Sequence, residues 1–528
     1  MIQRIFVCAI LIGVPVAAAT CDNLASLKLE NTSITAAQPV AEGAFTTPGA
    51  RPNAPVPAIY KTLPAFCRVQ GVIQPSSDSH TEFEVWLPAS AWNGKYFGVG
   101  NGGFAGSIDY VEGPARNVPG LADALSAGYA ASATDAGHKG GPTDAKWALG
   151  HPEKVVDFGY RAIHETAEQS KAIIRAFYGE APKHSYFDSC SNGGREALME
   201  AQRFPADYDG IIAGAPAASF THILAAFTLD IQATEDDPAS YISSAKLPAI
   251  GSAVLSACDA LDGLKDGVID DPRKCHFDPG TLLCTSAESD SCLTQPQVVA
   301  LRKIYAGART SKGEQIYPGY LPGGETGPSG WTAWLTGPGP GKSAHYAFAT
   351  QGGAYLIFQN ADWNYRTFNP DRDVKIADDT MGQRLNATDP NLKVFKNRGG
   401  KLVLYHGWSD GALAPTATID YYQSVVSNMG RKDADSFTRL YMVPGLQHCN
   451  PGTGPNSFGG PMIAALERWV EQRSAPDKII ATKFKADGNP SNGVVRTRPL
   501  CPYPQVARYS GSGSIDEAAN FACAIPKP

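Results

Sequence analysis

The chain has few charged residues and no excess of basic ones. Asp, Glu, Lys and Arg make up 18% of its 528 residues, and the formal net charge is −6. A negative net charge argues against a nucleic-acid partner and leaves no basic patch for an anionic membrane. We therefore expect neither nucleic acid nor membrane among its partners.

Long hydrophobic runs are also lacking, except at the N-terminus. There, Arg4 precedes the apolar run from Ile5 to Val16 and three alanines that end at Ala19. The run is too short for a membrane span of about 20 residues, but this arrangement is typical of a secretory signal peptide. The sequence predicts that residues 1–19 are removed and that the mature chain is secreted or periplasmic.

Glycine, proline and cysteine are plentiful by comparison. The 54 glycines and 40 prolines indicate a loop-rich enzyme rather than a helical bundle. Of the 11 cysteines, Cys8 is lost with the signal peptide, which leaves an even number in an oxidising compartment. All of them are therefore expected in disulfides, although the count alone does not give the connectivity.

One stretch has the pattern of a nucleophile elbow, in which a serine sits on a sharp turn between a strand and a helix. Residues 184–187 predict a short buried strand, and residues 196–204 have helical spacing. Ser191 lies between them, with Ser189 in the place of the first glycine of G-x-S-x-G and Gly193 in the place of the second. The same stretch also fits an ordinary strand–turn–helix crossover.

The cysteines near Ser191 and His448 strengthen the catalytic interpretation. Cys190 directly precedes Ser191, and Cys449 directly follows His448. If the two cysteines are bonded, their Cα atoms lie about 4.4–6.8 Å apart, which brings the serine and the histidine together. A serine needs such a base to act as a nucleophile. Alternatively, the bond only stabilises the fold, by about 2–4 kcal/mol in the free energy of unfolding.

The acid of a hydrolase triad is expected between the serine and the histidine in chain order. An apolar run over residues 402–405 predicts a strand, and the loop after it ends in Asp410. Asp is also common in such turns for local reasons. His406 lies near Asp410 but has no cysteine beside it, so we interpret it as structural and His448 as the base.

These residues resemble the Cys-Ser, Asp and His-Cys arrangement of the tannase and feruloyl esterase family. The resemblance extends over nearly the whole mature chain. It implies an α/β-hydrolase with a mostly parallel central sheet, a Ser191–His448–Asp410 triad and carboxylic ester hydrolase activity. The other matching motifs are Trp92-Asn93-Gly94-Lys95, Gly193-Gly194-Arg195-Glu196-Ala197-Leu198, Phe204-Pro205-Ala206-Asp207-Tyr208-Asp209-Gly210 and Cys501-Pro502-Tyr503-Pro504. The implied disulfides are Cys21–Cys67, Cys190–Cys449, Cys258–Cys275, Cys284–Cys292 and Cys501–Cys523.

A glycine-rich loop at residues 100–106 follows a predicted strand, where an α/β-hydrolase builds half of its oxyanion hole. The resemblance implies that the backbone N–H of Gly103 is one donor and that of Asn192 is the other. The alternatives are a flexible surface loop and a phosphate loop. No Lys-Ser/Thr pair follows, which disfavours the phosphate loop.

The alternation of strands and helices stops between about residues 219 and 385. We interpret this segment as a lid domain of helices, loops and disulfides, inserted between hydrolase segments 20–218 and 386–528.

Two local patterns outside the lid segment predict secondary structure. Residues 21–63 are expected to form a helix and surface loops, and Asn93-Gly94 is a hairpin-turn signal.

The lid segment contains an acidic stretch suited to a hard cation. Asp259, Asp262 and Asp266 are spaced by three and four, with glycines that permit tight turns. The resemblance implies a structural Ca²⁺ held by these three side chains and by the carbonyls of Leu264 and Val268. The alternative is a solvated acidic turn pinned by the disulfide of Cys258.

The family implies the substrate class. Its members take esters of hydroxycinnamic or gallic acids, and one branch cleaves mono(2-hydroxyethyl) terephthalate with a lid arginine for the free carboxylate. Near that position stands Tyr355, which can stack on a phenolic ring but cannot form an ion pair with a carboxylate. A feruloyl-type esterase is therefore expected, acting on small aromatic esters, including those attached to polysaccharide. A tannase ranks second and the terephthalate half-ester last.

Two interpretations from other classes remain open at the level of sequence. The chain could be a catalytically silent binding protein on a hydrolase fold, because fold alone does not give function, or a secreted serine peptidase. One departure from the family concerns Gln447, which occupies the place before His448 where many relatives have a small residue. We expect it to alter loop packing or to line the pocket.

Overall fold

The computed structural model describes residues 19–50, 55–111 and 117–526. Apart from Ala19, the predicted signal peptide lies outside these residues, as does Cys8. Within them, no helix has both the length and the apolar character needed to cross a bilayer.

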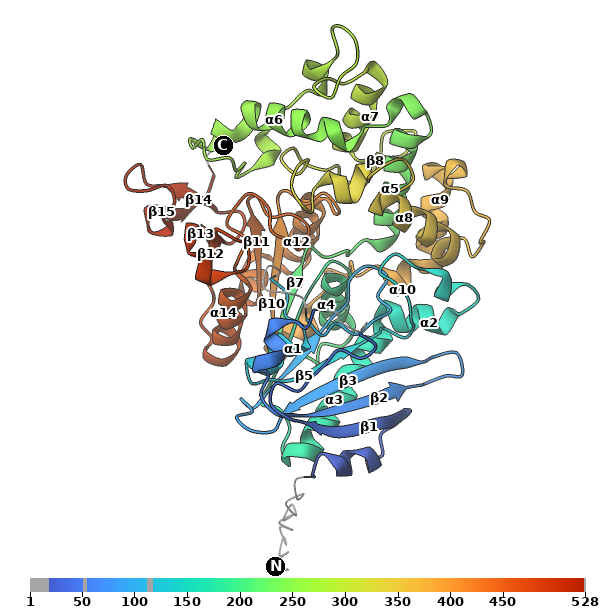
Figure 1. Ribbon diagram of the computed structural model, residues 1–528, viewed down its shortest axis with the longest axis vertical. Coiled ribbons are helices and arrows are strands. Elements are labelled where there is room, and N and C mark those ends of the chain that lie inside the picture. The colour runs from blue at the N-terminus through green and yellow to red at the C-terminus, as the bar shows by residue number, and fades with distance from the viewer. Residues whose placement is uncertain (1–18, 51–54, 112–116, 527–528) are drawn as a thin grey trace, which may run out of the picture.

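A nine-stranded sheet organises the molecule (Figure 1). Its strand order is β1-β2-β3-β5-β4-β6-β7-β10-β11. The pairs β1–β2, β2–β3 and β3–β5 are antiparallel, and every later pair in this order is parallel. The strands are β1 (Thr32–Val40), β2 (Phe66–Ile73), β3 (Thr81–Pro88), β4 (Lys95–Val99), β5 (Ala130–Thr134), β6 (His184–Cys190), β7 (Gly210–Gly214), β10 (Lys401–Gly407) and β11 (Thr438–Val443).

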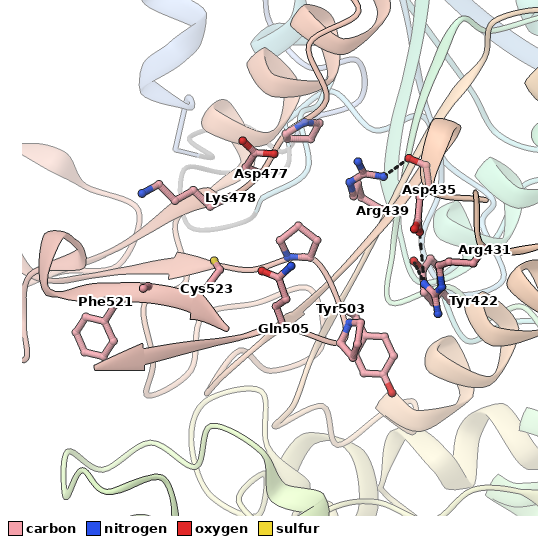
Figure 2. Close-up of a pocket in the computed structure, with 14 residues that line it drawn as sticks. Tyr422, Arg431, Asp435, Arg439, Asp477, Lys478, Tyr503, Gln505, Phe521 and Cys523 are labelled. Atoms are coloured by element: carbon pink, nitrogen blue, oxygen red, sulfur yellow. Dashed lines mark hydrogen bonds and ion pairs between the residues drawn. The ribbon is translucent and has the colours of Figure 1, made fainter. Parts of the chain in front are cut away.

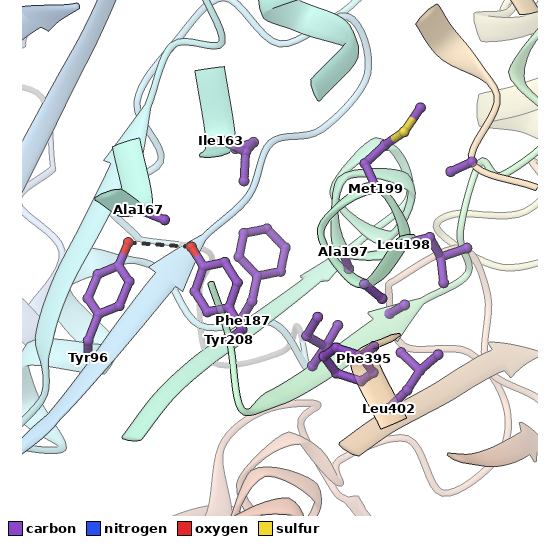
Figure 3. Close-up of a cluster of buried hydrophobic side chains, with 14 of the residues drawn as sticks. Tyr96, Ile163, Ala167, Phe187, Ala197, Leu198, Met199, Tyr208, Phe395 and Leu402 are labelled. Atoms are coloured by element: carbon purple, nitrogen blue, oxygen red, sulfur yellow. Dashed lines mark hydrogen bonds between the residues drawn. The ribbon is translucent and has the colours of Figure 1, made fainter. Parts of the chain in front are cut away.

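The central parallel strands are buried on both faces, as their nearly continuous apolar sequences require. Side chains alternate between two hydrophobic clusters, with Phe187 and Leu402 in one and Tyr186 and Val403 in the other. Figure 3 shows the first cluster, where residues of α4 (Asn192–Arg203) pack over the sheet and Tyr96 approaches Tyr208. The opposite face is covered by α1 (Leu121–Ser126) and α14 (Gly459–Gln472).

Two local predictions were wrong. The described part of residues 21–63 contains no α-helix; it forms two short 3₁₀ turns and β1, whose partly exposed edge position does not demand a strongly apolar sequence. Asn93-Gly94 does not close a hairpin either, because β3 and β4 are each paired to β5 rather than to one another. Instead, the Asn93 side chain accepts a hydrogen bond from the backbone N–H of Lys95 and shapes the entry to β4.

Between β7 and β10 the chain adds no strand to the main sheet. This segment forms the upper part of the molecule in Figure 1, opposite β1–β3. Its short strands β8 (Ala308–Arg309) and β9 (Gln315–Tyr317) pair only with each other. Its helices are α5 (Phe220–Glu235), α6 (Leu247–Cys258), α7 (Gln295–Ala306), α8 (Ala344–Gln351), α9 (Pro370–Ala377) and α10 (Gln383–Leu385).

The remaining helices connect or flank the strands, and the C-terminal tail adds two small sheets. Tyr503 N–H donates to the Leu440 carbonyl, so the tail is bonded to β11. These elements are α2 (Pro152–Val156), α3 (Ala162–Tyr178), α11 (Lys393–Asn397), α12 (Pro415–Met429), α13 (Arg431–Phe437), β12 (Ile479–Phe484), β13 (Val494–Leu500), β14 (Val506–Tyr509) and β15 (Phe521–Ala524).

The predicted disulfide connectivity is confirmed throughout. The structure pairs Cys21–Cys67, Cys190–Cys449, Cys258–Cys275, Cys284–Cys292 and Cys501–Cys523. Five disulfides indicate that the chain folds in an oxidising compartment.

Candidate active site

Ser191 stands on the sharp turn between β6 and α4. Its φ of +66° is in a region that residues other than glycine rarely occupy, so the surrounding structure must hold it there. Gly193 allows the approach of α4, because a Cβ at that residue would lie 1.9 Å from Ser189 Oγ. At Gly194 a Cβ would lie 2.3 Å from the Gly214 carbonyl oxygen. The two glycines therefore permit the close approach of helix and strand that a glycine in the place of Ser189 would normally allow.

The structure brings Ser191, His448 and Asp410 into one line. Ser191 Oγ lies 2.9 Å from His448 Nε2, and His448 Nδ1 lies 2.7 Å from Asp410 Oδ2. Asp410 Oδ1 accepts hydrogen bonds from the backbone N–H groups of Ala412 and Leu413, at 2.7 and 2.9 Å. These bonds fix the carboxylate, and through it the imidazole.

His406 shares Asp410 with His448. Its Nε2 lies 3.0 Å from Asp410 Oδ2, and its Nδ1 lies 2.7 Å from Thr418 Oγ1. Burial by itself raises the pKa of Asp410, but the charge of His448 and the hydrogen bonds from both histidines hold that pKa well below its ordinary value. His406 thus buttresses the acid, a contact that sequence reasoning did not find.

The disulfide between Cys190 and Cys449 links the turn that carries Ser191 directly to the loop that carries His448. Its Cα atoms are 6.1 Å apart, although the cysteines are 259 residues apart in sequence. Each cysteine adjoins one of the residues that form the Ser191–His448 contact. The bond therefore brings Ser191 and His448 together, as the sequence predicts.

Gly103 and Asn192, the two predicted oxyanion donors, border the same small cavity as Ser191. Gly103 has a φ of +59°, and a Cβ there would lie 2.3 Å from the Pro142 carbonyl oxygen. Only glycine fits this position without displacing backbone.

Glu196 ties together the two segments that carry these donors. One of its carboxyl oxygens accepts the backbone N–H of Asn101 and the other accepts Nδ2 of Asn192, both at 2.9 Å. Arg195 Nε donates to Asn192 Oδ1 at 2.8 Å. Burial raises the pKa of Glu196 to about 8. Sequence reasoning gave this pair no role; the signal was two adjacent charged residues near the start of the helix that follows Ser191.

Two cavities adjoin Ser191. The smaller, of about 60 Å³, is lined mainly by apolar side chains, and the larger, of about 400 Å³, also has polar ones. Trp334 and Phe348 border both, whereas Tyr355 borders neither. The smaller cavity is lined by Phe104, Phe220, Leu224, Phe227 and Leu413 among others, and the larger by Asn101, Asp109, Thr143 and Asn450 among others.

A still larger cavity, of about 810 Å³, lies elsewhere (Figure 2). It is bordered by Tyr422, Arg439 and Tyr503, and by residues of the C-terminal tail. None of the predicted catalytic residues lines it. Size alone would therefore point to the wrong place, and the chemistry of the side chains locates the candidate site.

The acidic stretch between β7 and β10 places several carboxylates near one another. Burial and then the charges of Asp266 and Asp259 raise the pKa of Asp262. Burial and then the charge of Asp262 raise the pKa of Asp270 to about 8. Such crowding of carboxylates is relieved by a divalent cation. Asp266 is already partly neutralised, since Arg498 donates to it at 2.6 Å.

Among the described residues, the group whose possible ligand atoms lie close enough to share a metal comprises His164, Glu200 and Asp207, and the acidic stretch at Asp259, Asp262 and Asp266 does not form such a group. His164 Nδ1 lies 2.6 Å from Asp207 Oδ2, and Lys171 Nζ lies 3.6 Å from the other oxygen of Asp207. The His164 imidazole and the Lys171 ammonium thus already contact the two oxygens of Asp207, and we assign no metal to this group.

The sheet, the elbow and the alignment at Ser191 together define an α/β-hydrolase. The chain belongs to the tannase and feruloyl esterase family, whose model matches residues 67–524. It is a carboxylic ester hydrolase.

Two relatives and one solved structure illustrate the similarity. An esterase of Xanthomonas campestris described as uncharacterized is 42% identical over 96% of this chain and 91% of its own. The mono(2-hydroxyethyl) terephthalate hydrolase of Piscinibacter sakaiensis is 38% identical over 90% and 87%. The crystal structure of feruloyl esterase B from Aspergillus oryzae superimposes with a TM-score of 0.84 at 28% identity, covering 96% of this chain and 99% of that one.

Proposed function

We propose that this protein hydrolyses feruloyl-type aromatic esters through an acyl-enzyme on Ser191. The observation that carries the proposal is the line of contacts from Ser191 Oγ through His448 to Asp410. Similarity to the feruloyl esterase structure supports the substrate class.

In the proposed reaction, His448 Nε2 takes the proton of Ser191 as Oγ attacks the ester carbonyl. Asp410 holds the tautomer with Nδ1–H and stabilises the imidazolium that forms. The backbone N–H groups of Gly103 and Asn192 bind the oxyanion. Collapse of the intermediate releases the alcohol with the proton from His448, and water then attacks the acyl-enzyme by the same route.

The walls beside Ser191 support an aromatic acid. A cavity of about 150 Å³ can bind benzene, so the smaller cavity, of about 60 Å³, cannot enclose a phenolic ring by itself. In the part of the chain that the structure describes, Trp334 and Phe348 are the aromatic rings, apart from the His448 imidazole, that border both cavities, so a phenolic ring bound beside Ser191 is expected to contact them. The larger cavity has room and polar groups for the hydroxyls of an alcohol, including a sugar.

The substrate ranking is tested on the purified chain with methyl ferulate, methyl gallate and mono(2-hydroxyethyl) terephthalate. The highest kcat/KM is expected for methyl ferulate, and Ser191→Ala should abolish turnover. Comparable kcat/KM for ferulate and the terephthalate half-ester would overturn the ranking. That half-ester remains a candidate because of the 38% identity to its hydrolase, but none of the described residues that line the two cavities is an arginine.

We also propose that the lid binds one structural Ca²⁺ through Asp259, Asp262 and Asp266, with the carbonyls of Leu264 and Val268. The crowded carboxylates support this assignment. Elemental analysis of the purified chain should find about one calcium per chain, and removal with EDTA should lower Tm. If metal content and Tm both stay unchanged after chelation, the proposed site is wrong.

Secretion is likewise a proposal, supported by the five disulfides. If the signal peptide is cleaved as proposed, N-terminal sequencing of the exported chain will start at Thr20. A mature chain that retains residue 1 would contradict it.

A further inference from the structure

The residue before His448 joins the catalytic loop to the lid. Gln447 is 2% exposed although its side chain is long and polar. Its Oε1 accepts the backbone N–H of Ser329 at 2.9 Å, and its Nε2 donates to the Thr326 carbonyl at 2.5 Å. Both partners belong to the lid. The amide therefore makes two hydrogen bonds across the boundary between the lid and the catalytic loop.

The lid backbone is shaped around this amide. Gly327 has a φ of +106°, and a Cβ there would lie 2.6 Å from Gln447 Nε2. At Gly330 a Cβ would lie 3.0 Å from the same atom. A side chain at either glycine would displace Gln447, so the two glycines and the glutamine form one fitted contact.

The same segment, residues 323–336, also crosses the loop that carries Asp410; we call it the strap. A Cβ at Gly324 would lie 2.6 Å from the Ser409 carbonyl oxygen. Trp331, which is buried, packs so closely that a Cβ at Gly411 would lie 2.9 Å from its ring. The strap thus packs against the loop that carries Asp410 and against the loop that carries His448. Gln447 supplies side-chain hydrogen bonds between the strap and the His448 loop.

Trp334 lies on the strap, within the π-helical turn Thr332–Thr336. Its ring meets His448 edge-on, with centroids 4.9 Å apart and an interplanar angle of 82°. It also borders both cavities beside Ser191. Any shift of the strap therefore moves a wall of the substrate site.

We propose that Gln447 is a positioning residue that fixes the strap, and through it Trp334, and so sets the preference for aromatic acyl groups. This inference rests on the proposed function. The physical reason is that loss of the amide leaves the Ser329 N–H and the Thr326 carbonyl without partners, which favours displacement of the strap. An acetyl group is too small to depend on the Trp334 wall, whereas a phenolic ring is expected to contact it.

The test compares two esters in the same variants. In Gln447→Ala, KM for methyl ferulate should rise about tenfold, as expected for the loss of buried hydrogen bonds, with kcat nearly unchanged. The kcat/KM for methyl acetate, which carries no ring in its acyl or alcohol part, should stay at the wild-type value. Gln423→Ala is the matched control, because Gln423 is an exposed glutamine on α12. If the wild type prefers another aromatic ester, that ester replaces methyl ferulate.

A double-mutant cycle shows whether Gln447 acts through Trp334. Trp334→Ala should cause the same substrate-selective loss, and the double variant should lose no more than Trp334→Ala alone. In hydrogen exchange, the amide of Ser329 should exchange faster in Gln447→Ala, while α14 stays unchanged.

Equal losses on both esters, or independent losses in the cycle, would overturn the inference, because Gln447 would then act on His448 itself. Wild-type kinetics in Gln447→Ala would overturn it as well. A wild type that hydrolyses no aromatic ester contradicts the proposed function and the inference together, and the wild-type assay alone reveals that case.

Discussion

Cys190 and Cys449 are joined by a disulfide with a Cα separation of 6.1 Å, and each is the chain neighbour of a residue in the Ser191–His448 contact. The bond restrains the two loops in the orientation that aligns hydroxyl and imidazole. It therefore serves the geometry of the site as well as the stability of the fold.

Replacing both cysteines, in Cys190→Ser with Cys449→Ser, should lower kcat as well as Tm. A disulfide of this kind contributes about 2–4 kcal/mol, and without it the loops no longer share a restraint at the site. The matched control is Cys284→Ser with Cys292→Ser, which opens a loop of sequence separation 8 within the lid. If both double variants keep the same kcat, the Cys190–Cys449 disulfide only stabilises the fold.

Asp410→Asn should reduce kcat by about a thousandfold or more, because the amide cannot hold His448 in the Nδ1–H tautomer. KM should change little, since Asp410 lies behind His448 and away from the cavities. The variant should also lose the stability that the depressed pKa of Asp410 confers. That stability is present above about pH 4 and is lost as the pH falls through the folded pKa. Denaturant titrations from pH 7 down to pH 2 follow its loss.

Glu196→Gln should lower kcat by about tenfold to a hundredfold with a small effect on KM. The amide has one acceptor oxygen for two donors, so either Asn101 or Asn192 is released and one oxyanion donor shifts. Kinetics with methyl ferulate check this result. A rise in KM alone would contradict it.

The raised pKa of Glu196, about 8, gives a second readout. A buried carboxyl whose folded pKa exceeds its unfolded value of about 4.3 makes the native state less stable as the pH rises from about 4.3 to 8. Glu196→Gln should flatten the pH dependence of the unfolding free energy in that window. The exposed Glu42→Gln is the control.

Gly103→Ala should reduce kcat by about a hundredfold, the usual effect of losing one oxyanion donor. The added Cβ would meet the Pro142 carbonyl oxygen, and the positive φ would be strained. Gly102→Ala is the matched control, because a Cβ there meets nothing within 4 Å. Circular dichroism verifies that both variants fold. Equal activity of the two would remove Gly103 from the proposed hole.

Local patterns predicted much of the fold correctly. The strand predicted at residues 184–187, which the structure extends to Cys190, and the helix after it follow from burial and periodicity, which act over neighbouring residues. The edge strand β1 and the pairing of β4 were missed. Edge strands are half exposed and carry a weak signal, and strand order depends on partners from distant parts of the chain.

The sequence by itself determined the identities that the chemistry needs: a serine on an elbow, a histidine and an acid in hydrolase order, and cysteines beside the first two. Short-range spacing and chain order carry that information. Only the tertiary structure decided that His406 shares Asp410, that Glu196 joins two loops and that Gln447 holds the strap. The contacts of Glu196 and Gln447 unite segments far apart in sequence, whereas His406 and Asp410 are four residues apart and meet because of the shape of the loop after β10. All of them form only when packing excludes water from the side chains that meet there.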